Sequence, residues 1–188
     1  ATRTCVDSAF KRLKDDAQPQ ARVVVLLAGH GNLRSPLDQY YLNVYDTDPQ
    51  DYTGTALSWH VLMDRLAVCK GQVLLVLDTC KSGDLLTDVQ RVVKELEKPD
   101  WSVRVLAACG PGKNADESKW EGHGYLTGAL LSALRGEKKE LVSSGGYISY
   151  DSNMIRYIQQ RVEEAAGGSG QHVIANQPRE AGAIPLAR

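Results

Sequence analysis

A thiol and an imidazole each follow an uninterrupted apolar run in this 188-residue sequence. Residues 21–29, ARVVVLLAG, lead into His30, and residues 71–79, GQVLLVLDT, lead into Cys80. Short apolar runs rich in β-branched residues predict buried strands. Neighbouring parallel strands lie about 4.8 Å apart, so residues one step beyond their ends face each other across a small gap.

Such a pair is suited to nucleophilic catalysis. The imidazole of His30 favours the Cys80 thiolate at neutral pH and can then protonate a leaving amine. Gly31 follows directly, so its backbone N–H can donate to a developing oxyanion, with the N–H of Cys80 as the second donor. Either residue alone is more often structural, but their placement at equivalent strand ends favours a catalytic dyad.

Asp78 ends the second strand, two residues before Cys80. A partly buried carboxylate without a partner is costly, and a cationic substrate side chain would satisfy it. This placement predicts cleavage after Arg or Lys. The alternative is that Asp78 is paired inside the protein, with an Arg or a backbone N–H. Asp116 and Glu117 are further candidates for the substrate groove, or else solvated loop charges.

Alternating apolar and amphipathic stretches must position these residues. Besides the two strands above, apolar runs predict a strand over 101–110, an edge strand or hairpin arm over 40–46, and one or two strands within 172–188. Amphipathic spacing predicts helices, which fall at 55–69 (Thr55 as N-cap), 85–98, 124–136 and within 145–168 (capped by Asp151 or Ser152).

The order of these elements indicates an α/β fold, with a mostly parallel sheet flanked by helices on both faces. Right-handed crossovers then bring the loops after the strands to the carboxyl edge of the sheet, which is where His30 and Cys80 fall. We interpret residues 1–188 as one domain, since no linker or internal repeat interrupts them.

Composition excludes several classes of function. The net charge is −1, with 43% hydrophobic and 24% charged residues, and no basic patch indicates nucleic acid or an anionic membrane as a partner. No apolar run approaches the roughly 20 residues of a membrane span, and the first residues lack a signal-peptide layout. We therefore expect a cytoplasmic protein.

The remaining cysteines and one further histidine are expected to be structural. Cys5, Cys69 and Cys109 lack the close spacing of zinc or dithiol sites, and we expect small buried hydrophobic side chains there. His123 and Gly124 follow no strand and are expected to form a turn or helix cap.

Three stretches carry a family resemblance: LLAGHG, VLLVLDTCKSGD and VRVLAACGPGKNADESKWEGHGYLTGALLSALRG. Together they resemble the caspase-like cysteine peptidases, specifically the bacterial metacaspase or orthocaspase type, over nearly the whole chain. The resemblance implies a caspase–hemoglobinase fold, with Cys80 as nucleophile, His30 as general acid/base, and Gly31 and Cys80 as oxyanion donors. Asp78 matches the position that reads a basic side chain in metacaspase-type enzymes.

Two departures from the family bear on the site. Relatives usually have Ser-Gly-His where this chain has Ala28-Gly29-His30, which removes a pocket hydroxyl. Relatives also begin with a further strand and helix, whereas residues 4–16 here look like the helix just ahead of the His-bearing strand. The sheet would then have an unpaired edge, so we expect residues 1–188 to be one piece of a processed or multi-chain enzyme whose missing strand another chain or segment supplies.

The leading hypothesis is thus a cysteine endopeptidase cutting after Arg or Lys, activated by processing or a regulatory signal. The alternative is a catalytically idle caspase-like scaffold or interaction module. A nucleotide-binding domain is disfavoured because no G-x-G-x-x-G or Walker-type loop follows any strand.

The sequence requires no cofactor and indicates no metal ligands. Many metacaspase-type relatives use calcium, and Asp46, Asp48 and Asp51 are acidic candidates for binding it, although spacing alone does not show a site. Autocleavage is expected in the lysine-bearing loops 94–100 and 135–140.

Overall fold

The computed structural model describes residues 1–16, 18–34, 39–69, 71–80, 103–109, 122–168, 171–175 and 182–188, with backbone only for Leu33, Arg34, Cys80 and Cys109.

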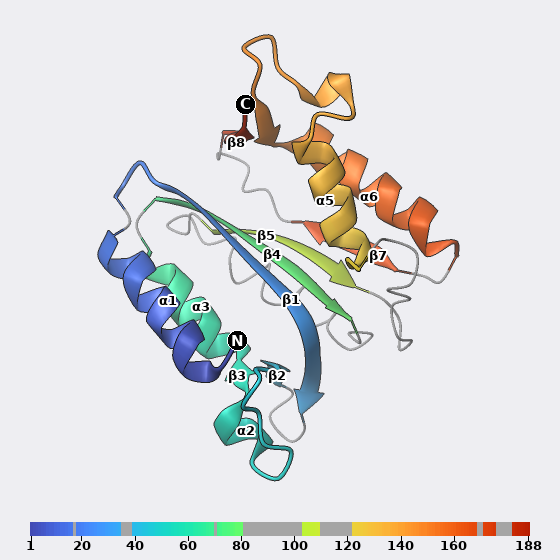
Figure 1. Cartoon of the computed structure of the whole chain (residues 1–188). Coiled ribbons are helices and arrows are strands. Elements are labelled where there is room, and N and C mark those ends of the chain that lie inside the picture. Colours follow the sequence, from blue (N-terminus) through green and yellow to red (C-terminus); the bar gives the residue numbers. More distant parts are fainter. Residues whose placement is uncertain are drawn as a thin grey trace.

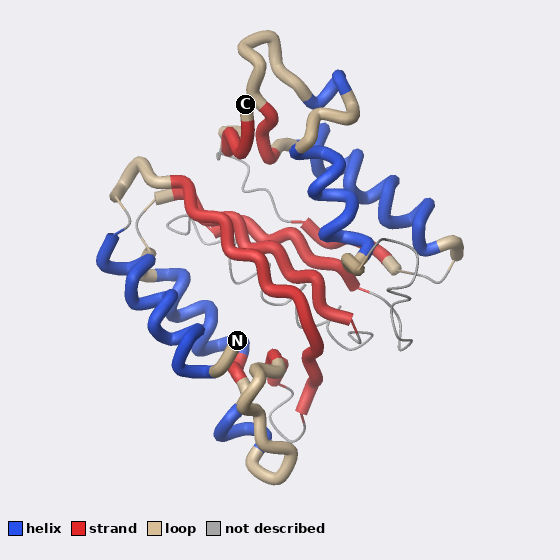
Figure 2. Tube along the Cα trace, viewed as in Figure 1, coloured by secondary structure: helices blue, strands red, loops and turns tan. Residues whose placement is uncertain are grey.

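A six-stranded sheet forms the centre of the protein, in the order β3-β2-β1-β4-β5-β7 (Figure 2). The three central strands are parallel, whereas β2 and β3 join antiparallel on one side and β7 on the other. The strands are β1 (Arg22–Arg34), β2 (Gln39–Leu42), β3 (Leu57–Ser58), β4 (Gln72–Cys80), β5 (Val103–Cys109) and β7 (His172–Ala175). A second, two-stranded sheet pairs β6 (Ile148–Tyr150) with β8 (Ile184–Ala187).

Helices cover both faces of this sheet, which confirms the expected α/β architecture (Figure 1). Helices α1 (Arg3–Asp16) and α3 (Trp59–Ala67) lie on one face, and α5 (Tyr125–Leu134) and α6 (Ser152–Ala166) lie on the other. The short helix α2 (Tyr52–Thr55) precedes β3, and a 3-10 turn spans Lys139–Leu141. None of the described helices combines the length and apolar content needed to cross a membrane.

The two apolar layers meet the sheet through alternate residues of β4. Leu75 and Leu77 pack with α1 and α3, whereas Leu74 and Val76 pack with α5 and α6. Successive side chains of a strand point to opposite faces, so a strand buried on both faces must be apolar throughout. This requirement explains the unbroken apolar run of residues 73–77.

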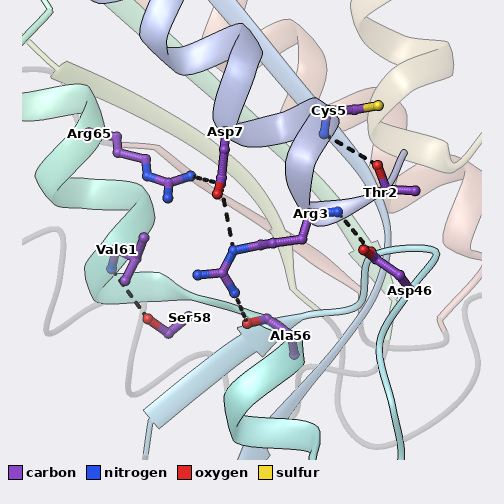
Figure 3. Close-up of polar contacts among 9 residues, drawn as sticks. All are labelled: Thr2, Arg3, Cys5, Asp7, Asp46, Ala56, Ser58, Val61 and Arg65. Atoms are coloured by element: carbon purple, nitrogen blue, oxygen red, sulfur yellow. Dashed lines mark hydrogen bonds and ion pairs between the residues drawn. The ribbon is translucent and has the colours of Figure 1, made fainter.

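Helix α1 is held by polar contacts at its first turns (Figure 3). The backbone N–H of Arg3 donates to Asp46 Oδ1 at 2.7 Å, and its guanidinium donates to the Ala56 carbonyl at 2.6 Å. Arg65 of α3 pairs with Asp7 of α1. Partly exposed ion pairs add little stability, so these contacts chiefly fix the position of α1, whose Phe10 is buried in the core.

One predicted helix begins later than expected. The pattern at 55–69 predicted a helix capped by Thr55, but Thr55 ends α2, and Leu57 pairs in β3. Helix α3 begins at Trp59, and its N-cap is Ser58, whose hydroxyl accepts from the Val61 N–H at 3.3 Å. The prediction was wrong because the helical spacing of the apolar residues extended across a short edge strand.

The expectation for the cysteines holds at one position and fails at another. Cys69 is buried, and burial raises the pKa of its thiol. Cys5 is exposed on α1, so its predicted burial was wrong. The reason is that Phe10 and the partly buried Val6 and Leu13 turn the other face of α1 toward the core.

Strand β1 is paired along only part of its outer edge. Residues 31–34 pair with β2, but residues 22–30 have β4 on one side and no strand among the described residues on the other. Within that stretch Val24 and Leu26 are 52% and 46% exposed, although their partners in β4 are fully buried. The two side chains lie on the α5/α6 face of the sheet, whereas the unpaired backbone N–H and C=O groups along the edge are what favour pairing with a further strand.

A matched pair of substitutions tests this difference between neighbouring strands. Leu75→Ala removes a fully buried side chain and should lower the free energy of unfolding by about 3 kcal/mol, because it leaves a cavity. Leu26→Ala should lower it by less than about 1 kcal/mol, because that side chain is half exposed in this chain. Urea denaturation of both variants measures the two values, and equal losses would contradict the partial exposure of Leu26.

Candidate active site

His30 and Cys80 form the last pair of the parallel ladder between β1 and β4. Cys80 ends β4, whereas β1 continues past His30 to Arg34, so the strand predicted over 21–29 was too short. The parallel ladder pairs Ala28 with Asp78, Gly29 with Thr79, and His30 with Cys80. Residues paired in this way lie about 4.8 Å apart between strands. The register therefore brings the predicted acid/base residue and the predicted nucleophile together at one edge of the sheet.

His30 is held chiefly through its backbone. Its carbonyl accepts a hydrogen bond from the Asn43 N–H at 2.8 Å, just where β2 leaves the sheet. The imidazole is exposed and has no hydrogen-bond partner among the described residues. It is therefore open to solvent.

Gly31, the predicted oxyanion donor, packs closely against Tyr40. A Cβ at this position would overlap the Tyr40 hydroxyl, so only glycine fits. That hydroxyl donates to Thr79 Oγ1 at 3.1 Å. The contact ties β2 to the residue just before Cys80. Gly31 itself is the first residue of β1 that pairs with β2, one residue beyond the end of the β1–β4 ladder.

Asp78 is buried at the amino end of helix α5 and is only 4% exposed. Its Oδ2 accepts the Thr127 backbone N–H at 2.9 Å and also the Thr127 hydroxyl. Gly124, the N-cap residue of α5, offers no side-chain oxygen, and a Cβ there would overlap the Asp78 carboxylate. Asp78 thus supplies the helix cap from another element, where its charge also interacts favourably with the helix dipole.

The second oxygen of Asp78 is in a different position. Oδ1 is buried, yet no described residue donates a hydrogen bond to it. Internal pairing, the alternative considered for this residue, is thus present at Oδ2 through a backbone N–H. The unsatisfied Oδ1 is the atom that a cationic ligand would favour.

The other candidates divide into three groups. Ala28 is exposed beside Asp78 in the ladder. His123 precedes the Gly124 cap in a turn, so its predicted capping or turn role is confirmed. Outside the described residues lie Asp116, Glu117, the loop 94–100 and the helix predicted at 85–98.

Two of the three acidic residues considered for calcium accept hydrogen bonds from backbone N–H groups. Asp46 accepts the Arg3 N–H, and Asp48 accepts the Gln50 N–H at 2.8 Å. Within the described ranges, no group of three or more His, Cys, Asp or Glu side chains could hold a metal ion.

Sequence reasoning missed the residues that support the site. Thr127 is an ordinary helix residue in the sequence and Gly124 was expected only as part of a turn or helix cap, and only the fold brings them to Asp78. One signal was present: a helix that begins at a glycine lacks its own side-chain cap, which indicates that another element provides one.

Comparisons with known proteins support the fold alone. The sequence matches no protein-family model and no curated protein. The structure is similar to the crystal structure of protein GSU0716 from Geobacter sulfurreducens, a structural-genomics target, with a TM-score of 0.57 and 16% sequence identity. The match covers 94% of this chain and 73% of that chain. At this identity the likeness shows a shared α/β fold and says nothing of activity.

Proposed function

We propose that the chain is a caspase-like cysteine endopeptidase that cuts after Arg or Lys. The observation that carries this proposal is the pairing of His30 with Cys80 in the ladder, two residues beyond the buried Asp78. The α/β sheet with helices on both faces is compatible with the caspase–hemoglobinase fold that the motifs imply.

The reaction uses the two paired residues in sequence. His30 takes the Cys80 thiol proton, and the thiolate sulfur attacks the carbonyl carbon of the scissile bond. Negative charge then develops on the carbonyl oxygen, where the N–H groups of Gly31 and Cys80 can donate. The imidazolium gives its proton to the leaving amine as the carbon–nitrogen bond breaks, and water later hydrolyses the thioester.

Asp78 gives the proposed preference for a basic residue before the scissile bond. One of its oxygens caps α5, while the other is buried without a described partner. A guanidinium or ammonium group can supply the missing donor and neutralise the buried charge. An acidic substrate side chain would instead be repelled.

A further proposal concerns the open edge of β1. We infer that another chain or segment contributes a strand along residues 22–29, since no strand among the described residues pairs with that edge of β1. That strand would complete the sheet beside the proposed dyad. The cytoplasmic location, calcium binding and autocleavage in the loops 94–100 and 135–140 stay predictions, and the first of these loops lies outside the described residues.

Substitution of the dyad tests the proposed chemistry. Cys80→Ala and His30→Ala should lower hydrolysis of Arg- and Lys-terminated fluorogenic peptides by at least about 10³-fold, because either change removes a reacting group. Cys5→Ala, at an exposed cysteine of α1, is the control and should leave activity unchanged. Failure of the wild type to cut Arg-, Lys- or Asp-terminated peptides, with calcium or with chelator, would favour the idle scaffold.

Asp78→Asn tests the preference for basic residues. Asparagine keeps the shape and an oxygen for the Thr127 donors but loses the charge, so kcat/KM on Arg peptides should fall about 100-fold. Asp151→Asn is the matched control, because Asp151 caps α6 by accepting the Asn153 and Met154 N–H groups. An unchanged kcat/KM in Asp78→Asn, or cleavage only after Asp in the wild type, would overturn this role.

The partner strand is tested by composition of the native protein. Intact-mass analysis of the active native preparation should detect polypeptide in addition to residues 1–188, because the open edge needs a strand. A lone, well-folded and active 188-residue species would refute the inference.

A further inference from the structure

A group of polar and aromatic side chains lies beside His30, on the side away from Asp78. Asn32 Nδ2 donates to the Tyr52 hydroxyl at 3.0 Å, and that hydroxyl donates to Asn43 Oδ1. The rings of Tyr41 and Tyr52 meet edge to face, with centroids 5.9 Å apart. We call Asn32, Asn43 and Tyr52 the amide–tyrosine cluster.

The cluster is built into the strand that carries His30. Asn32 stands two residues beyond His30 in β1, so it shares the same face of the strand at a distance of about 7 Å. Asn43 reaches the same point from β2, and its backbone N–H donates to the His30 carbonyl. Two extended residues of a bound peptide span a similar length.

The proposed reaction fixes the direction in which a peptide crosses this edge. The side chain before the scissile bond turns to Asp78, on the β4 and α5 side. His30 protonates the leaving amine, so the peptide that follows this amine must extend past His30 toward β2. The amide–tyrosine cluster lies in that direction.

We propose that the amide–tyrosine cluster is the subsite that holds the first two residues after the scissile bond. The assignment rests on the proposed peptidase function. The cluster would contact the leaving peptide, which is the part of the substrate that the dyad and Asp78 do not bind.

The hydrogen bonds of the cluster leave two of its polar atoms without a partner among the described residues. Because Tyr52 occupies Asn32 Nδ2 and Asn43 Oδ1, the remaining atoms are Asn32 Oδ1, an acceptor, and Asn43 Nδ2, a donor. Neither has a hydrogen-bond partner among the described residues. One acceptor and one donor match a peptide group, which offers an N–H and a carbonyl. The subsite therefore recognises the backbone of the leaving peptide rather than one particular side chain.

Comparing two substrates separates binding of the leaving peptide from the cleavage reaction itself. An internally quenched peptide with one Arg and four residues after it can contact the subsite, whereas an Arg coumaryl amide has no residues there. In Asn32→Ala and Tyr52→Phe, the ratio of kcat/KM on the peptide to kcat/KM on the amide should fall about 5- to 10-fold, the effect of one or two hydrogen bonds. Tyr45→Phe, at a tyrosine that is 87% exposed, is the matched control and should keep the wild-type ratio.

A modified peptide sharpens the test. An N-methyl group on the second residue after the scissile bond removes an N–H that Asn32 Oδ1 can accept. Methylation should lower the ratio in the wild type but should not lower it further in Asn32→Ala, as expected for two changes to one interaction.

The opposing outcomes are distinct. An unchanged ratio in both variants would overturn the subsite, and so would an equal loss on both substrates, because the cluster would then act only by positioning His30. Hydrolysis of neither substrate by the wild type would overturn the peptidase proposal and the subsite with it.

Discussion

The parallel ladder between β1 and β4 is the constraint on which the rest of the site depends. A register shift of one residue would move every side chain of a strand to the opposite face. The apolar residues of β4 are buried against helices on both faces, so such a shift would place each of them in the wrong layer. The core packing therefore also fixes which residue of β1 lies opposite Cys80.

Asp78, two residues before Cys80, connects strand β4 to helix α5. The side chain of Asp78, in β4, reaches the first turn of α5. Its carboxylate accepts the N–H that a side chain of the N-cap residue would otherwise accept, because Gly124 has none. Fixing one oxygen on Thr127 orients the other, which remains buried without a described donor. A structural role at one oxygen and a binding role at the other are thus compatible in one side chain.

Much of this arrangement followed from the sequence, for physical reasons. Apolar runs of β-branched residues indicate strands, so β1, β4 and β5 were predicted from residues 21–29, 71–79 and 101–110. Asp151 was predicted as a cap because its side chain can reach the first N–H groups of its own helix. Each of these signals depends on residues close together in the sequence, so it can be recognised without knowing the fold.

The features that sequence reasoning missed are set by contacts between distant segments. The Thr127 donors lie 49 residues from Asp78, and the Tyr40 hydroxyl lies 39 residues from Thr79. The helix expected at 55–69 failed for a related reason, because Leu57 pairs with Leu42 of β2 and so belongs to the sheet. Burial of Cys5 depended on which face of α1 meets the core, and the aromatic Phe10 decides that face.

Strand β1 carries both His30 and the unpaired edge, so a change at that edge can affect the position of the imidazole. Over residues 22–30, β1 is held by β4 alone among the described strands, while its far end is fixed by β2. Hydrogen bonds along one side hold a strand less firmly than bonds along both. A strand added at Val24 and Leu26 would therefore restrain the same segment that sets the position of His30. A strand that completes the sheet would, for this reason, also help to align His30 with Cys80 in the proposed dyad.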